Sequence, residues 1–314
     1  MAEKKKYTAQ YIALAILVAV AILIAYRGAG PLALRLRLSG WIPPFHGEWR
    51  VVQYAGTSEN QSMFYSIEDS SGGLVLIDGG WNQEGDIEQV WSAIKKHRGH
   101  VDAWVITHAH PDHAGAFLGV MKKYGDQFTV DQIYTPPVNM ERFEETAQDY
   151  DVPEVFEEFY SLTSEMDNVT YLEENDEVDL LGLDMKVLHS WDSHVDEQDA
   201  NLLNDGSLMF RVSGAEDTIL FCADTQKEME QYILENHADE LKADYVQCGH
   251  HGNWGLTTDF YDRVDASVAM IDAPSSITED TTGTYDCPQL IQYFEQKGTG
   301  VSDWQTQQYA FLIR

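Results

Sequence analysis

The sequence predicts an α+β domain that follows a single N-terminal transmembrane helix. Apolar runs of strand character alternate with segments of helical periodicity from about residue 48 to the end of the 314-residue chain. The apolar fraction of 44% is ordinary for a globular protein with a hydrophobic core. A separate run of 20 uncharged residues, Tyr7 to Tyr26, is long enough to cross a bilayer as a helix. We therefore expect a cytoplasmic tail at 1–6, an anchor at 7–26, a linker at 27–47 and a globular domain at 48–314.

Basic residues around the apolar run predict how the anchor is oriented. Lys4, Lys5 and Lys6 precede the run and would be held on the cytoplasmic side, although Arg27 follows it and weakens this bias. No small-x-small cleavage site directly follows the run, so we expect a single-pass protein of the cell membrane with its domain outside the cytoplasm. Secretion after cleavage of a signal peptide is the alternative.

Hydrophobic periodicity places most elements of the globular domain. The expected strands cover residues 49–54, 63–67, 74–77, 101–106, 207–212, 218–222, 243–248 and 309–313. The expected helices cover residues 86–98, 114–124 and 227–236. An acidic and aromatic stretch at about 140–166 is expected to form a helical insertion beside the functional site.

A short segment after the strand at 101–106 concentrates metal-binding side chains. His108, His110, Asp112 and His113 fall within six positions. Imidazole and carboxylate are ligands that suit zinc and related divalent ions, and this spacing can serve two adjacent ions. The alternative is a solvated polar turn, which is disfavoured because each of these side chains is costly to desolvate without a partner.

Two further groups of candidate ligands follow strands in the second half of the chain. Asp224 lies between the strand at 218–222 and the helix at 227–236, where it could also simply cap the helix. His250 and His251 follow the strand at 243–248 and are flanked by glycines, which allow close approach of the backbone. Two adjacent histidines in this position are better ligand candidates than one.

The pattern Thr107-His-x-His-x-Asp-His after a strand resembles the signature of the metallo-β-lactamase superfamily of hydrolases. Leu74 to Gly80 resembles the strand and Asp-Gly-Gly turn of that family, in which Asp78 would orient ligand histidines from beneath the metals. The later motifs are similar to a branch that includes the β-lactamase-like domain of bacterial competence (DNA-uptake) channel proteins and phosphorylcholine esterase. The resemblance covers residues 48–314 and implies a four-layer αβ/βα sandwich, with two sheets inside and helices outside.

The resemblance also implies a ligand set for two metal ions. The expected ligands are His108, His110, Asp112, His113, Asp224 and His250. Asp224 would bridge the two ions, and His251 would contact the substrate or leaving group, although His250 and His251 could exchange roles. Many members carry one more histidine ligand for the first metal; here Asn204, His189, His194 or water could take its place. Ala223 stands where the family usually has a glycine before the bridging aspartate.

The implied chemistry is metal-dependent hydrolysis. Two zinc ions per chain are expected, with Mn²⁺ or Fe²⁺ also compatible. A hydroxide shared by the ions would attack the substrate, and Asp112 could handle the proton. A phosphodiester or related ester of the cell envelope is the expected substrate, although the fold itself does not specify one.

The charge balance constrains the partners. The chain has 20 Lys and Arg against 52 Asp and Glu, a formal net charge of −32. Such a surface repels phosphate backbones, so nucleic-acid binding is disfavoured, and a competence-type DNA nuclease would need a local basic groove. A non-catalytic, metal-stabilised envelope scaffold is the alternative from a different class. The three cysteines, Cys222, Cys248 and Cys287, show no pattern of a disulfide framework.

Overall fold

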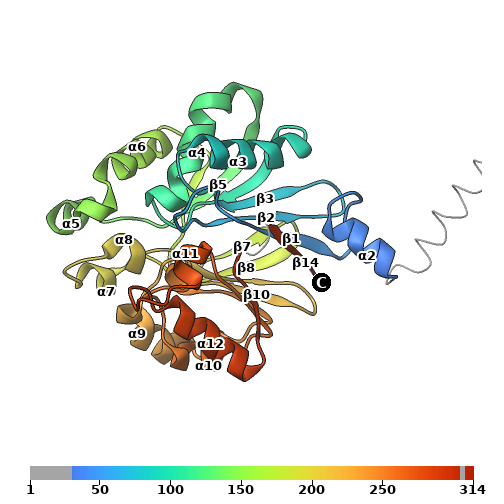
Figure 1. Cartoon of the computed structure of the whole chain (residues 1–314). Helices are drawn as coiled ribbons and strands as arrows, with labels where there is room; N and C mark the ends of the chain where they lie inside the picture. The colour runs from blue at the N-terminus through green and yellow to red at the C-terminus, as the bar shows by residue number, and fades with distance from the viewer. Residues whose placement is uncertain (1–29, 305–307) are drawn as a thin grey trace, which may run out of the picture.

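The computed structural model describes residues 30–304 and 308–314. Two seven-stranded sheets face one another, and helices cover their outer faces (Figure 1). The expected four-layer αβ/βα sandwich is therefore confirmed. The predicted anchor at Tyr7–Tyr26 lies outside the described residues. Within those residues, the structure contains no helix with the length and apolar character needed to span a membrane.

The first sheet is built by the first half of the chain together with the last strand. Its strands, in spatial order, are β14 (Gln308–Ile313), β1 (Trp49–Tyr54), β2 (Phe64–Glu68), β3 (Leu74–Asp78), β4 (His100–Val105), β5 (Thr129–Thr135) and β6 (Val169–Tyr171). The strands from β3 to β6 are parallel, whereas β14, β1, β2 and β3 pair antiparallel. The covering helices are α3 (Glu84–Lys96), α4 (Pro111–Tyr124) and α6 (Pro153–Ser164).

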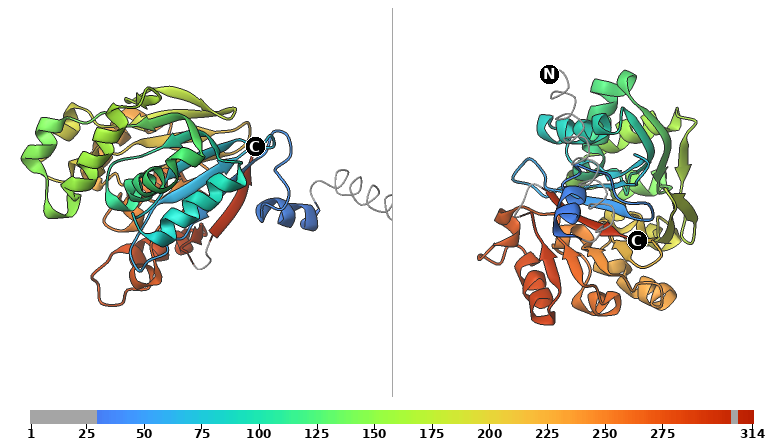
Figure 2. Two further views of the ribbon diagram at one scale, coloured as in Figure 1. Left: turned by 90° about the horizontal axis from the view of Figure 1, so that it is seen from above. Right: turned by 90° about the vertical axis from the view of Figure 1, so that its right-hand side faces the viewer.

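The second sheet is built by the second half of the chain. Its strands, in spatial order, are β13 (Gly300–Ser302), β12 (Val268–Met270), β11 (Tyr245–Gln247), β10 (Thr218–Phe221), β9 (Met209–Ser213), β8 (Leu183–His189) and β7 (Glu177–Leu180). Parallel pairing runs from β10 to β13. The helices α9 (Lys227–His237), α10 (Thr258–Val264) and α12 (Cys287–Lys297) lie on its outer side, as two further views show (Figure 2).

Short helices gather at one end of the sandwich. They are α5 (Met140–Thr146), η2 (Asp149–Asp151), α7 (Ser193–Asp196), α8 (Leu202–Asp205), η3 (Gly249–Gly252) and α11 (Ser275–Thr278), whereas η1 (Gly125–Gln127) joins the far end of α4 to the start of β5. Among them, α5, α7, α8 and α11 lie beside the ends of the sheets that are furthest from α2 (Pro31–Leu38) (Figure 1).

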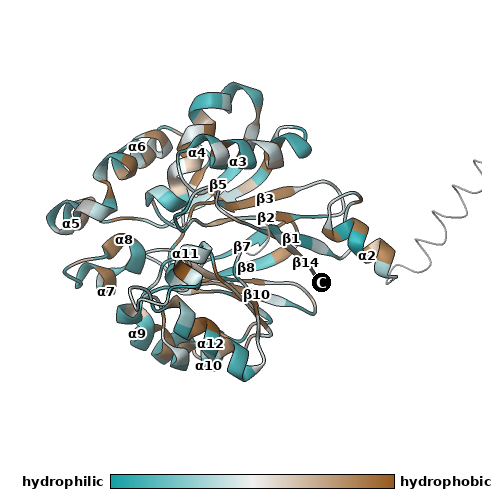
Figure 3. Ribbon diagram, in the orientation of Figure 1, coloured by the Kyte–Doolittle hydropathy of each residue, from teal (hydrophilic) through white to brown (hydrophobic). Residues whose placement is uncertain are grey.

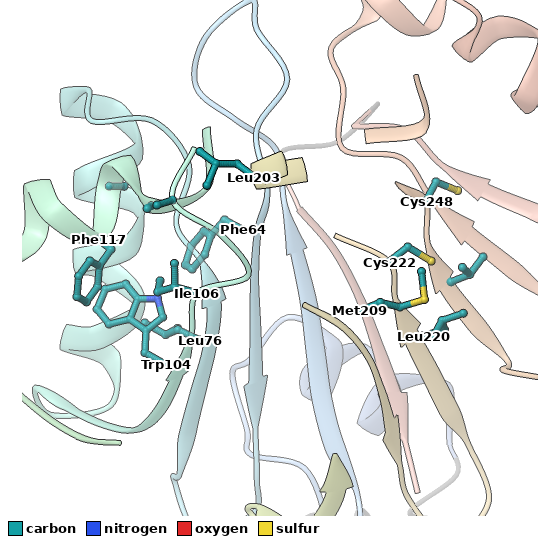
Figure 4. Packing of buried hydrophobic residues seen from close by; sticks show 14 of the residues in the cluster. Phe64, Leu76, Trp104, Ile106, Phe117, Leu203, Met209, Leu220, Cys222 and Cys248 are labelled. Carbon is teal, nitrogen blue, oxygen red and sulfur yellow. The ribbon is translucent and has the colours of Figure 1, made fainter. Parts of the chain in front are cut away.

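The core follows from the two-residue period of the strands. In β3, Val75 and Ile77 belong to the buried cluster between the sheets, whereas Leu74 and Leu76 belong to the cluster beneath the helices. Such strands read as continuous apolar runs because both faces are buried. Figure 4 shows the outer clusters from close by, with Phe117 of α4 against Trp104, 5.0 Å apart between ring centroids. The three cysteines are buried and free.

The expected strands and helices are confirmed to within a few residues, with two instructive differences. The helix expected at 114–124 begins at Pro111, because proline is favourable in the first turn, so Asp112 and His113 lie on α4. Residues 31–38, expected within the linker at 27–47, form α2 instead. A buried ion pair between Arg37 and Glu48 packs this helix against the domain. The insertion at 140–166 is helical as predicted.

Candidate metal centre

The candidate ligands converge where strands of both sheets end. The ends of β3 and β4 lead to Asp78 and the His108–His113 segment, and the ends of β10 and β11 lead to Asp224 and to the histidine pair. Open α/β sheets bind their ligands at the carboxyl ends of parallel strands, because loops from neighbouring strands meet there. The two halves of the chain therefore contribute to one site.

Asp78 orients the histidines of the first half. Its carboxylate accepts hydrogen bonds from the backbone N–H of Thr107 at 2.7 Å, from the Thr107 hydroxyl at 2.8 Å and from His113 Nδ1 at 2.7 Å. The Thr107 hydroxyl lies 3.1 Å from His108 Nδ1 and can accept its proton. With both Nδ1 atoms engaged in this way, the Nε2 lone pairs of His108 and His113 are free for a metal ion.

His108 and His110 form one side of the cluster. His108 Nε2 lies 3.1 Å from His110 Nδ1 and 3.9 Å from a carboxylate oxygen of Asp224. The other ring nitrogen of His110, Nε2, lies 3.0 Å from Asp151 Oδ1, a buried carboxylate of η2. Asp151 thus fixes the His110 ring from the insertion at 140–166.

His113, Asp112 and His251 form the other side. His251 Nε2 lies 3.2 Å from Asp112 Oδ2, 3.3 Å from Asp224 Oδ2 and 3.2 Å from His113 Nε2. His113 Nε2 in turn lies 3.2 Å from Asp224 Oδ1. Asp224 therefore approaches histidines on both sides, and its backbone N–H donates to Ser207 Oγ.

The sequence left open whether His250 or His251 is the metal ligand. The geometry favours His251. His251 is fully buried among the carboxylates. The Nε2 of His250, the residue expected as the ligand, lies 3.9 Å from Asp224 Oδ2, as far as His108 Nε2 does. Exposure distinguishes the pair, because the His250 side chain is 14% exposed and lines the cavity. Its Nδ1 lies 2.5 Å from the carbonyl oxygen of Asn253. The Nδ1–H therefore donates to this carbonyl, and Nε2 is left free.

The backbone around the centre is strained. Non-glycine residues with positive φ include Asp78 (54°), Ala223 (48°), His250 (50°) and His251 (58°). Each such conformation costs on the order of 1–2 kcal/mol, and these outliers cluster at functional sites. The left-handed conformation of Ala223 explains why a glycine is favourable at this position.

The electrostatics favour positive charge at the centre. Burial opposes the ionised form of Asp112, but His251 and His113 outweigh this effect and lower the pKa of Asp112 to about 2. The same balance holds the pKa of Asp224 well below its usual value. Burial likewise disfavours protonation of His251, yet Asp224 and Asp112 raise its pKa to about 9. Burial and the neighbouring His113 and His110 lower the pKa of His108 well below its ordinary value.

These residues fit divalent metal ions. Two sets of buried residues have ligand atoms within 4.8 Å of one another: His108, His113 and Asp224, and Asp112, His113 and His251. A cation between these carboxylates and nitrogen lone pairs would offset the cost of burying them together. A third set, His100, Asp102 and Asp131, is partly to fully exposed and is explained by surface ion pairing.

The three candidates for the remaining ligand of the first metal differ in placement. Asn204 is buried at the cavity wall, and its Oδ1 makes no hydrogen bond within the described residues. His189 Nε2 lies 2.5 Å from the carbonyl oxygen of Asp205, and His194 is exposed beside Tyr232. The geometry favours Asn204 among the three.

A cavity of about 710 Å³ opens onto the centre. His110, Asp112, Asp224 and His250 line its floor, and Lys227 is the lysine at its wall. Its aromatic lining residues are Trp81, Tyr150, Trp254 and Tyr285, and its further carboxylates are Glu59 and Glu228. The volume is that of a small-molecule site.

Some residues of the metal centre and its cavity could not be predicted from the sequence. Asp151, Tyr150 and Tyr285 approach the site through packing of the insertion and of a distant loop, whereas Trp81 and Trp254 closely follow the Asp78 turn and the histidine pair. The acidic and aromatic character of residues 140–166 indicated the neighbourhood of the insertion, but a single carboxylate among several acidic residues could not be selected.

Comparison with known proteins agrees with this geometry. The family model of the metallo-beta-lactamase superfamily matches residues 58–269. The chain belongs to the metallo-beta-lactamase superfamily. No curated protein matches the chain significantly by sequence.

Several solved structures share this superfamily fold. The metallo-beta-lactamase fold protein YhfI from Bacillus subtilis aligns with a TM-score of 0.50 and 13% identity, over 85% of this chain and 99% of YhfI. CmlA, a diiron beta-hydroxylase from Streptomyces venezuelae, aligns with a TM-score of 0.54 and 11% identity, over 86% of this chain and 55% of CmlA. A variant of CmlA aligns with a TM-score of 0.53 and 12% identity, over 94% of this chain and 59% of the variant. At these identities the likeness shows the fold alone.

Proposed function

We propose that this metallo-beta-lactamase superfamily protein is a membrane-anchored, metal-dependent hydrolase with two zinc ions that acts on a phosphodiester or related ester of the cell envelope. The observation that carries the proposal is the position of Asp224, whose two oxygens approach His113 and His251 at 3.2–3.3 Å and His108 at 3.9 Å. A single carboxylate between two groups of imidazoles is suited to bridge two ions.

Different residues would bind each of the two ions. His108 and His110, with Asn204 beside them, would hold the first ion, and Asp112, His113 and His251 the second. Bound there, the ions would supply Lewis acidity and a water that ionises near neutral pH. Asp112, on the cavity floor, would accept the proton of that water. Asp78 and Asp151 keep the histidine rings in place.

His250 would contact the substrate. Because its Nδ1–H is donated to the Asn253 carbonyl, its Nε2, 3.9 Å from Asp224 Oδ2, is left as an acceptor for a substrate hydroxyl or a transferred proton. The left-handed backbone at both histidines turns one ring into the centre and the other toward the cavity. The pair thus combines a ligand and a substrate contact.

The charge of the cavity favours small neutral or zwitterionic diesters over DNA. Glu59, Glu228, Asp112 and Asp224 line it, against Lys227. Fixed negative charge slows the approach of a polyanion, and salt screens it over about 8–10 Å at physiological ionic strength. The site itself would attract the single phosphate of a diester when the ions are bound.

The first test is a screen of the zinc-loaded full chain in detergent against phosphodiester, phosphomonoester, carboxylic ester and lactone probes. We expect the highest kcat/KM for a small zwitterionic phosphodiester. Single-stranded DNA at low and high salt is the comparison substrate. A faster reaction with DNA at low salt that declines as salt rises would replace this proposal with a nuclease. Two bound zinc ions with no turnover of any probe would favour the scaffold.

The histidine pair supplies a second test. His251→Ala should lose bound zinc and turnover together, whereas His250→Ala should keep its zinc and lose turnover. His100→Ala, in the exposed surface set, is the matched control and should change neither quantity. Loss of zinc in His250→Ala with zinc retained in His251→Ala would restore the original assignment of His250 as ligand.

The anchoring part of the proposal has its own test. Protease added to intact spheroplasts should remove the domain that follows Tyr26. Protection until lysis would place the domain in the cytoplasm and would remove the argument for an envelope substrate.

A further inference from the structure

Exposed apolar side chains concentrate at the end of the domain where the chain enters it. Leu32 is 63% exposed, Leu34 41% and Trp41 83%. Within the described residues these three are part of a group of seven large, exposed apolar side chains, and they lie within ten residues of one another. Figure 3 shows hydrophobic residues on α2 at the margin of the molecule. Single exposed apolar residues are ordinary, but a concentration at one end indicates a contact surface.

The same end departs from the acidic character of the chain. Residues 27–50 contain four arginines and one glutamate, and that glutamate, Glu48, is buried against Arg37. Arg35 is exposed on α2. Trp41 lines a surface cavity together with Lys96 and Arg98, and the acidic residues of this lining are Glu68, which is paired with Arg50, and Asp69. Tryptophan and arginine beside exposed leucines are typical of residues that lie at the headgroup level of a bilayer.

The chain itself indicates what covers this surface. The uncharged run Tyr7–Tyr26 ends five residues before α2 begins at Pro31. Five residues span at most about 18 Å, so a run that crosses a bilayer would hold α2 close to the lipid headgroups.

We infer that α2 and Trp41 form a membrane-contact surface that seats the domain on the lipid headgroups beside its anchor. This surface rests on the anchoring part of the proposed function and is independent of the hydrolysis. Leu32, Leu34 and Trp41 enter the headgroup layer, and Arg35 pairs with lipid phosphate.

The position of the surface determines which way the metal centre faces. The helices α5, α7 and α8 lie at the opposite end of the molecule from α2 (Figure 1), and Asn204 of α8 and Tyr150 of η2 line the cavity there. A domain seated on α2 therefore presents its cavity away from the bilayer. The substrate class that follows is a water-soluble or wall-linked ester, and lipids of the anchoring membrane are excluded.

Tryptophan fluorescence tests the contact directly. The full chain has eight tryptophans and none within 7–26, so quenching by brominated phospholipids reports on the domain alone. The full chain, Trp41→Phe and Trp254→Phe would be compared in nanodiscs of brominated lipid. Trp254 is the matched control, because it is 51% exposed at the cavity. We expect quenching to be lost in Trp41→Phe and retained in Trp254→Phe.

The other results overturn the inference. Quenching that disappears in Trp254→Phe would mean that the cavity faces the bilayer. Equal or absent quenching in all three proteins would mean that the domain does not rest on α2. Leu32→Gln/Leu34→Gln should reduce quenching of Trp41 with zinc content unchanged, which separates lost contact from lost folding. A full chain that fails to float with vesicles would refute the anchor, whereas failure of the hydrolase proposal would leave the quenching pattern intact.

Discussion

Asp224 is the residue on which the metal centre depends most. Its oxygens reach histidines from both sheets, and the carboxylate is almost completely buried. A methyl group cannot bridge ions or balance their charge. In Asp224→Ala we expect bound zinc to fall from two ions to one or none and turnover to fall below about one hundredth, because even partners of metal ligands are worth about 10–100-fold.

A matched variant distinguishes this loss from a general effect of removing a carboxylate. Asp131→Ala alters the exposed set with His100 and should leave elemental zinc content and kcat unchanged. Wild-type zinc and turnover in Asp224→Ala would show that Asp224 neither holds the ions nor takes part in the reaction.

Asp78 acts through its hydrogen bonds and does not need to touch an ion. Asp78→Asn keeps the size of the side chain and tolerates the positive φ of 54°, but it removes the charge that holds His113 Nδ1–H. Zinc affinity is expected to fall about 10–100-fold, as measured by competition with a chromophoric chelator. The far-ultraviolet circular dichroism should stay that of the wild type. Unchanged affinity would assign Asp78 a purely structural role.

At the scale of elements, the packing of α4 against the turn after β3 positions the ligands. Gly115 lies on the first turns of α4, and a Cβ there would come within 2.5 Å of Asn82 N and 3.0 Å of Gly80 O. Gly115→Ala must therefore move the helix that carries Asp112 and His113. We expect a loss of about 1–3 kcal/mol in unfolding free energy together with weaker zinc binding.

Gly125 provides the control for this variant. It ends the same helix at a right-handed φ of −51°, and a Cβ there would meet nothing within 4 Å. Gly125→Ala is expected to leave zinc binding unchanged and to stabilise by about 0.4–1 kcal/mol in urea unfolding. Equal zinc affinity in the two variants would refute the coupling between this contact and the centre.

A second contact between elements predicts a pH dependence. Glu68 of β2 is buried beside Arg50 of β1 and beside Lys96 and His97 at the end of α3. Burial would raise the pKa of Glu68, but His97, Arg50 and Lys96 outweigh it and lower the pKa far below its usual value. The stabilisation is thus present above the unfolded pKa of about 4.3 and is lost as pH falls toward the folded pKa.

The variant Glu68→Gln tests the direction of this pH dependence. At pH 7 it should destabilise by about 3–5 kcal/mol, because Arg50 is left buried without its ionic partner. The difference from wild type in denaturant unfolding should shrink progressively below about pH 4. A difference that stays constant down to pH 2 would mean that the carboxylate charge is not what stabilises this junction.

At the scale of the whole molecule, the metal centre joins the two sheets. His108, Asp112 and His113 follow β4 of the first sheet, whereas Asp224 and His251 follow β10 and β11 of the second. An ion held by both halves stabilises the folded state only. At a thousand times its dissociation constant, each ion contributes about 4 kcal/mol, and each kcal/mol raises Tm by roughly 2 °C in a large domain.

Chelation should therefore lower Tm by about 8 °C for each ion removed, as measured by differential scanning calorimetry, and added zinc should restore it. Asp224→Ala is the control, since its Tm should respond little to the chelator. An equal Tm with and without chelator in the wild-type chain would show that the centre does not hold metal under these conditions.

Local pattern alone determined much of this protein. Short apolar runs predicted eight of the strands, β1 to β4, β9 to β11 and β14, because a strand buried on both faces is apolar at successive positions. The strand followed by His-x-His-x-Asp-His predicted a compact ligand cluster, because a tight turn leaves the side chains of His108 to His113 little distance to separate.

The sequence pattern did not determine features that depend on contacts between distant segments. His250 and His251 are neighbours in the sequence, and only the left-handed backbone held by packing after β11 turns His251 inward and His250 toward the cavity. Asp151 reaches His110 through the fold of the insertion, and α2 is fixed by Arg37 on Glu48. Such placements depend on which surfaces pack together, and packing is a property of the whole chain that short-range periodicity does not encode.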